Sequence, residues 1–155
     1  MTLQAVQDFL RHHAPDIEVV EKPVSTATVA EAAAAHGVAP AQIAKTLSLW
    51  LGPQAVLLVL AGDARIDNRK FKDRFGSKPK MLAADEVEQW TGHAVGGVCP
   101  FGLSRALPVY ADVSLQRFAQ VLPAAGSTRS ALRIAPQRLA ELTRAQWVDV
   151  AALPG

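Results

Sequence analysis

The chain opens on a helical hydrophobic pattern, since Leu3, Val6, Phe9 and Leu10 fall on one face of a helix. This pattern predicts an amphipathic helix over the first dozen residues that ends near Pro15, because the residue before a proline disfavours helical geometry. The β-branched residues that follow predict a short strand over residues 17–20.

Residues typical of helix boundaries mark the next segment. Thr28 and Glu31 have the spacing of a capping box, which predicts the start of an alanine-rich helix. Gly37 predicts that this helix stops after His36. Pro40 suits the first position of a helix and therefore predicts one further helical turn.

Two apolar runs in the middle of the chain predict buried strands. They cover residues 45–51 and 55–61, and the turn Gly-Pro-Gln between them predicts a hairpin. Residues 68–75 predict a basic amphipathic helix that directs Phe71 and Phe75 inward at i, i+4 spacing. A strand over residues 80–82 and a helix over residues 85–90, closed by Gly92, are expected next.

The last third of the chain predicts shorter elements. These are a strand over residues 108–111, a helical turn over 115–118, strands over 121–122 and 131–134 on either side of the tight loop PAAGSTRS, and a final helix over 136–142. Strands and helices alternate without a regular βαβ repeat. The order therefore predicts a mixed α+β domain with a curved sheet rather than a doubly wound sheet.

Length and composition agree with one domain over residues 1–155. Half of the residues are apolar and 19% are charged, which is typical of a folded chain. One cysteine cannot form an internal disulfide, and the N-terminal residues do not resemble a secretory signal, so we expect a cytoplasmic protein. The apolar runs are too short to span a bilayer, so no membrane partner is expected.

The net charge is only +2, but the charge is distributed unevenly. Seven basic residues against Asp67 and Asp73 give the segment from residue 65 to residue 80 a local excess of five. Such a segment could contact the phosphates of a nucleic acid, or it could be a solvated helix face. Its basic residues are Arg65, Arg69, Lys70, Lys72, Arg74, Lys78 and Lys80.

Common catalytic motifs are absent from the sequence. The four histidines lack metal-ligand spacing, so no metal site is expected, and no nucleophile elbow, phosphate loop or dinucleotide fingerprint is present. Cys99 stands close to His93 in sequence and could be a nucleophile. A lone cysteine is more often a small buried hydrophobic residue, which is the interpretation that we favour.

Two other features stand out. Lys45 is the one charged residue in an apolar segment, so it either extends its ammonium group to water or is kept for the charge of a ligand. The loop Gly96-Gly97-Val98-Cys99-Pro100-Phe101-Gly102 could be a plain tight turn. Its glycines would also let main-chain N–H groups approach an anion or a carbonyl oxygen.

Four strings in this order, IAKTL, VLAGDARIDNRKF, TGHAVGGVCPFG and AAGSTRSAL, resemble the aminoacyl-tRNA deacylase family typified by YbaK and the editing insertion of bacterial prolyl-tRNA synthetase. The resemblance covers about residues 20 to 150. It implies a compact α+β domain with a barrel-like mixed sheet. It also implies hydrolysis of the ester that joins a wrong amino acid to tRNA, by a free-standing protein without metal, cofactor or protein nucleophile.

The family's lysine matches Lys45, and its Gly-x-x-x-Pro motif matches residues 96–100. The resemblance therefore implies that Lys45 holds the terminal phosphate or ribose, while N–H groups of residues 96–99 polarise the ester carbonyl, with Gly96 and Gly97 foremost. The expected substrate-binding residues are Thr46, Val98, Cys99, Pro100, Phe101, Gly102, Gly126, Ser127 and Ser130.

The resemblance also bears on the substrate. Cysteine-specific relatives carry an acidic residue where this chain has Ser130 and Ala131, and some alanine-specific relatives place Asn where this chain has Thr46. We expect tRNA(Pro) carrying a small amino acid, namely Ala, Ser, Thr, 2-aminobutyrate or Cys, with prolyl-tRNA synthetase as a possible partner. The alternative is a non-catalytic module that binds tRNA or a synthetase.

Overall fold

The longest strands form the hairpin that the sequence predicts. The computed structural model describes residues 2–154. β2 (Ile43–Leu51) and β3 (Gln54–Ala61) pair antiparallel from Ala44↔Ala61 to Leu51↔Gln54. β3 is buried from Ala55 to Ala61, because it lies inside the sheet and both of its faces are covered.

The main sheet has the order β6-β2-β3-β5-β8. β6 (Leu122–Pro123) pairs parallel with β2, β5 (Val109–Asp112) pairs parallel with β3, and β8 (Gln146–Val148) pairs parallel with β5. One antiparallel pair and three parallel pairs make a mixed sheet, which confirms the α+β class. Separate two-stranded ribbons join β1 (Val19–Glu21) to β7 (Ser130–Leu132) and β4 (Arg65–Ile66) to β9 (Ala151–Ala152).

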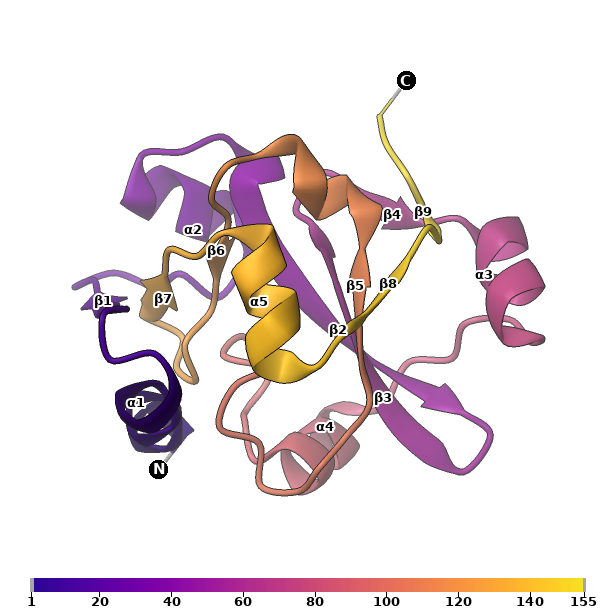
Figure 1. Ribbon diagram of the computed structural model, residues 1–155, viewed down its shortest axis with the longest axis horizontal. Coiled ribbons are helices and arrows are strands. Elements are labelled where there is room, and N and C mark those ends of the chain that lie inside the picture. The colour runs from indigo at the N-terminus through magenta and orange to yellow at the C-terminus, as the bar shows by residue number, and fades with distance from the viewer. Residues whose placement is uncertain (1, 155) are drawn as a thin grey trace.

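Helices surround this sheet (Figure 1). They are α1 (Thr2–His13), α2 (Val29–His36), α3 (Asn68–Phe75), α4 (Ala84–Thr91) and α5 (Pro136–Thr143), with the 3-10 helices η1 (Pro40–Gln42) and η2 (Val113–Arg117). The capping box of Thr28 and Glu31 starts α2, and Gly37 ends it in the left-handed conformation at φ 68°. Both boundary predictions are confirmed.

Other expectations need correction. The first short strand lies at residues 19–21 rather than 17–20. The expected strand at residues 80–82 is reduced to one bridge between Leu49 and Met81. β4, β8 and β9 were not predicted, because runs of two or three residues have no detectable alternation and form only through their distant partners.

Candidate functional site

A cavity of about 400 Å³ lies at the outer edge of β2. Its walls come from the start of α2, from β2, from α4, from the loop before Cys99 and from β6 and β7. Five of the predicted site residues line it, namely Lys45, Thr46, Gly96, Val98 and Ser130. Residues far apart in the sequence are therefore brought to one site of the size usual for small-molecule binding.

The cavity occupies a gap in the pairing of β2. On the edge of β2 that faces away from β3, Ile43 and Ala44 pair with β6. The same edge is bonded again further along, where Ser48 O accepts a hydrogen bond from Leu82 N and Trp50 N donates to Lys80 O. Main-chain groups alternate in direction along a strand. The main-chain groups of Ser48 and Trp50 point away from β3. Thr46 is two residues before Ser48, so its main-chain N–H and C=O also point away from β3, into the gap.

Lys45 is the one charged side chain among the cavity-lining residues that the structure describes. Its Nζ donates to Ala64 O at 2.5 Å and more weakly to Gly62 O at 3.4 Å. An ammonium group has three N–H donors, so one donor remains for a ligand. Burial lowers the pKa of Lys45 and Arg65 adds to this effect, while Asp63 opposes it.

Thr46 contributes a side-chain hydroxyl to the residues around the cavity. Its Oγ1 is buried and makes no hydrogen bond to any group within residues 2–154. A buried polar atom without a partner is costly, so this hydroxyl is expected to destabilise the free protein. Ser130 differs, because its fully buried side chain exchanges a hydrogen bond with Ser127 at 2.7 Å between the two Oγ atoms.

The glycine loop divides into a part that lines the cavity and a part that packs. Gly96 and Val98 line the cavity, and their N–H groups donate to no acceptor within the described chain. Gly97 does not line it, and its N–H donates to Ala94 O at 3.0 Å. A Cβ on Gly97 would lie 2.8 Å from Ser127 N, so this glycine lets two loops pack closely.

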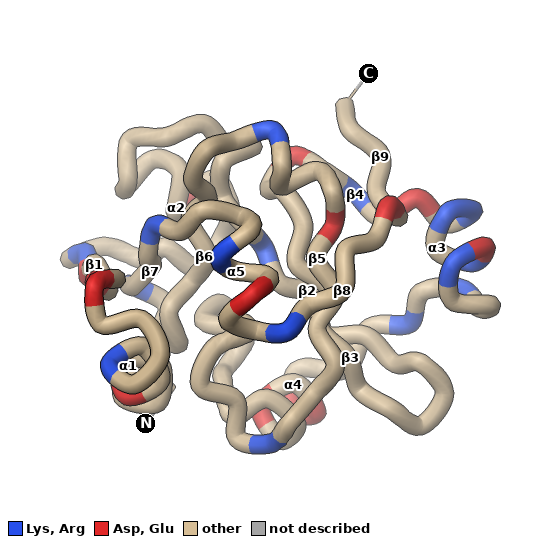
Figure 2. The backbone as a smooth tube through the Cα atoms, viewed as in Figure 1, with Lys and Arg blue, Asp and Glu red and all other residues tan. Residues whose placement is uncertain are grey.

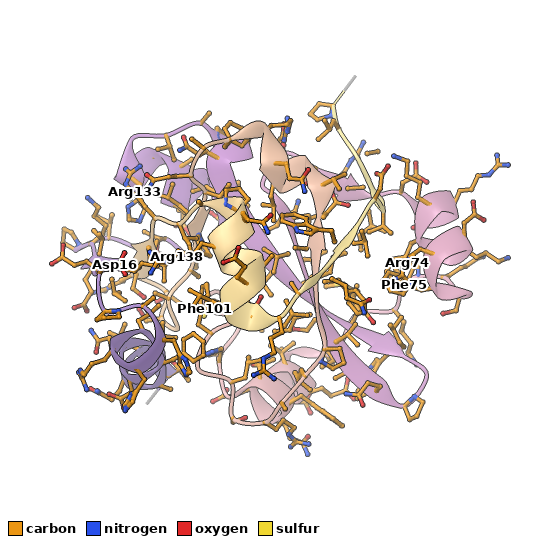
Figure 3. The ribbon with its side chains drawn as sticks, in the orientation of Figure 1. Asp16, Arg74, Phe75, Phe101, Arg133 and Arg138 are labelled. Carbon is orange, nitrogen blue, oxygen red and sulfur yellow. The ribbon has the colours of Figure 1, made fainter. Side chains whose placement is uncertain are left out.

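The second half of the glycine loop does not form part of the cavity wall, contrary to the prediction from the sequence. Cys99, Pro100, Phe101 and Gly102 do not line the cavity. Phe101 is fully buried beside α1, 5.9 Å from Phe9 between ring centroids (Figure 3). Gly102 packs against the main chain of Ala5. The apolar residues of this loop form core, because they complete the contact with α1.

Cys99 is a buried core residue, which agrees with the favoured interpretation. Burial raises the pKa of its thiol to about 12. His93 Nε2 lies 3.8 Å from Sγ but 2.7 Å from the carbonyl oxygen of Phe101, to which it donates. A ring nitrogen that holds this proton cannot accept another from the thiol. The pair therefore has no nucleophilic character.

The loop after β6 also lies differently from the prediction. Gly126 and Ser127 do not line the cavity. A Cβ on Gly126 would lie 2.6 Å from Thr2 O, so Gly126 packs against α1. Ser127 reaches the site only through its hydrogen bond to Ser130.

The basic segment is exposed at every predicted tRNA-contact position and includes α3, which lies at one end of the molecule (Figure 2). Asp67 caps the start of α3 by accepting from Lys70 N. The Lys70 ammonium donates to Asp149 and to Ala151 O. Arg65 follows the turn that Lys45 contacts, and Lys80 precedes Met81 of the cavity wall, so both ends of the segment adjoin the site.

Sequence reasoning missed several walls of the cavity. Thr26 and Ala27 precede α2, Met81 and Val87 come from around α4, and Val95 precedes the glycine loop. The capping box at Thr28 was the only available signal, and it predicted a helix rather than a site. Met81 and Val95 are large apolar residues with exposed side chains, 52% and 59% accessible.

No three His, Cys, Asp or Glu side chains within residues 2–154 lie together as a metal site. In the same range, no helix is both long and apolar enough to cross a membrane.

The fold and site define an α+β domain in which one lysine and two main-chain N–H groups without an acceptor in residues 2–154 lie around the cavity beside β2. Residues 23–142 match the model of the aminoacyl-tRNA editing domain, and the chain belongs to that family. It is 45% identical to the uncharacterized protein YwhH of Bacillus subtilis over 152 residues, 97% of each chain.

Two further similarities concern prolyl-tRNA synthetase. The chain is 28% identical over 114 residues, 73% of its length, to the proline–tRNA ligase of Bacillus licheniformis, of which the match covers 20%. It also superposes with a TM-score of 0.89 on the crystal structure of a candidate trans-editing enzyme for prolyl-tRNA synthetase. These two chains are 35% identical, and the match covers 99% of this chain and 98% of the other.

Proposed function

We propose that this protein is a trans-acting aminoacyl-tRNA deacylase, an ester hydrolase that frees tRNA from a wrong amino acid. The observation that supports this most is that Lys45, Gly96 and Val98 line the same cavity. The N–H groups of Gly96 and Val98 have no acceptor within residues 2–154. Among the described lining residues none is acidic, so an anionic RNA end meets no repulsive carboxylate there.

In the proposed reaction, the third N–H donor of Lys45 binds the terminal phosphate or ribose of the tRNA and orients the ester. The N–H groups of Gly96 and Val98 stabilise the negative charge that develops on the carbonyl oxygen. A water oxygen bonds to the carbonyl carbon, the bond from that carbon to the ribose oxygen breaks, and the ribose hydroxyl leaves with a proton. Gly97 is excluded as a donor because Ala94 O occupies its N–H.

These roles need no metal ion or cofactor, because the charge and the donors come from the protein and the leaving group is a ribose hydroxyl. We propose tRNA(Pro) carrying a small amino acid as the substrate. The similarity to a proline–tRNA ligase and to a candidate trans-editing enzyme supports this choice and makes prolyl-tRNA synthetase a reasonable partner in the cytoplasm. The small cavity would act as a second sieve that excludes larger side chains.

The exposed basic segment is proposed to contact the RNA outside the cavity. Its candidates are Arg65, Arg69, Lys70, Lys72, Lys78 and Lys80. Lys70 is the weakest of these, because its ammonium group already contacts Asp149. Binding through phosphates weakens steeply as salt rises, so an affinity that is independent of salt would contradict this contact.

The test is a deacylation assay on tRNA(Pro) charged separately with Ala, Ser, Thr, Cys or 2-aminobutyrate. Lys45→Met keeps most of the side-chain volume and removes the charge, so we expect a rate at least about 100-fold lower. Lys22→Met is the matched control, because Lys22 does not line the cavity. A transition-metal chelator should leave the wild-type rate unchanged.

An undiminished rate in a folded Lys45→Met variant would refute the role of Lys45. Tight binding of charged tRNA without hydrolysis of any of the five esters would favour the non-catalytic module instead.

A further inference from the structure

The direction of the Lys45 ammonium group is set by one turn, residues 62–64. Gly62 O and Ala64 O both accept hydrogen bonds from Lys45 Nζ. Ala64 N donates to Ala61 O, which closes the turn with Asp63 at its centre. Any movement of this turn would therefore move the ammonium group relative to the cavity.

The turn is held from outside by η2. Arg117 binds the Asp63 carboxylate with both terminal nitrogens, at 2.6 Å for Nη2–Oδ1 and 3.3 Å for Nη1–Oδ2. Arg117 Nε also donates to Ser114 O at 3.0 Å, and Ala61 N donates to Ser114 Oγ at 3.1 Å. Two-point contacts of this kind fix orientation as well as distance.

The other side of the turn packs closely against η1. A Cβ on Gly62 would lie 2.1 Å from Pro40 O, so the turn is in close contact with η1. The turn that carries the two carbonyl oxygens facing Lys45 therefore lies between η1 on one side and the Asp63–Arg117 pair on the other.

The same carboxylate acts on the charge of Lys45. The hydrogen bond from Arg117 holds the pKa of Asp63 below its usual range, and Lys45 adds to this effect. Asp63 in turn opposes the fall in the pKa of Lys45 that burial and Arg65 cause. Asp63 on the turn and Arg65 on β4 act on the charge of the ammonium group, and Arg117 on η2 acts on Asp63.

We propose that Asp63 and Arg117 are positioning residues of the deacylase, which aim the Lys45 ammonium group at the substrate through the turn at residues 62–64. This inference rests on the proposed function. The simpler role would be that of a surface ion pair, which contributes little to stability and nothing to catalysis.

The test compares Asp63→Asn and Arg117→Gln with Asp16→Asn and Arg138→Gln. Asp16 and Arg138 form a second two-point pair, at 2.5 and 2.6 Å, on the surface near α1 and α5 (Figure 3). We expect the Asp63 and Arg117 variants to lower kcat about tenfold with little change in KM, because a misplaced group costs rate rather than affinity. The control variants should match the wild type, and Arg117→Lys should recover part of the loss.

Two readouts separate positioning from plain stability. The alkaline decline of the rate should move to lower pH in Asp63→Asn, because Lys45 then loses its charge at lower pH. Asp63→Asn should cost little further rate when Lys45→Met is already present, because Asp63 acts through Lys45. Wild-type kcat and pH profile in Asp63→Asn, or equal losses in the control variants, would overturn the proposal.

A measurement without turnover keeps this inference separate from the proposed function. In protein labelled with 13C at lysine Cε, the Lys45 signal should titrate at lower pH in Asp63→Asn than in the wild type, whether or not any ester is hydrolysed. An unchanged titration would refute the coupling. A shifted titration in a protein that hydrolyses no charged tRNA would instead refute the deacylase.

Discussion

Replacing threonine by valine at two positions of the same cavity should change stability in opposite directions. Thr46 Oγ1 is buried without a hydrogen-bond partner in the described part of the chain, whereas Thr26 Oγ1 donates to Thr128 O at 3.2 Å. Valine has nearly the same shape and removes the hydroxyl in both cases. Thr46→Val therefore relieves an unpaired polar group, while Thr26→Val removes a hydrogen bond.

The magnitudes follow from these two environments. Relief of an unpaired buried hydroxyl should raise the free energy of unfolding by about 1–3 kcal/mol. Loss of the Thr26 hydrogen bond should lower it by about 0.5–1.5 kcal/mol. For a chain of this length, each kcal/mol moves the melting temperature by about 2–4 °C. The two variants should therefore lie on opposite sides of the wild type.

Thermal unfolding without substrate measures this difference, and urea unfolding gives the free energies. A Thr46→Val variant less stable than the wild type would show that the hydroxyl is satisfied in the free protein, and the reasoning would fail. If the hydroxyl is kept for the substrate, the same variant should also be the poorer deacylase, because stability is often traded for function at binding sites.

Two other outcomes are expected. Gly97→Ala should lower the free energy of unfolding by about 1–3 kcal/mol and remove most deacylation, because its Cβ would meet main-chain atoms of residues 126–127. An unchanged melting temperature and unchanged kinetics would contradict this. Burial lowers the pKa of His93, so below about pH 6.5 the unfolded chain takes up protons that the native protein does not. Melting temperature should fall from pH 7 to pH 5, and less steeply in His93→Gln; equal slopes would rule His93 out.

Local signals in the sequence were sufficient for much of the fold. The β2–β3 hairpin, the boundaries of α2 and the basic helix α3 were predicted from alternation, capping residues and apolar runs. These elements depend mostly on residues within one turn or one strand. β4, β8 and β9 depend instead on partners more than 30 residues away, and nothing local encodes such pairing.

The site was predictable only in part for the same reason. Lys45 stood out because a charge interrupts an apolar strand, and the Gly-Gly pair stood out because it permits close approach. Neither signal distinguishes Gly96, which lines the cavity, from Gly97, which packs against the loop at residues 126–127. Asp63 and Arg117 are 54 residues apart, so their contact has no signature in the sequence.

The cavity exists because the residues after β6 bond to β7 and no longer to β2. β6 leaves β2 after Pro123, because the next residues bond to β7 instead: Ala124 bridges Ala131, and Ala125 N donates to Ser130 O. On the other side, Met81 bridges Leu49. Between these contacts the edge of β2 has no partner at Thr46 among residues 2–154, and the unpaired stretch is flanked by Lys45. A strand edge left unpaired must find other hydrogen-bond partners, and we expect the substrate to supply them.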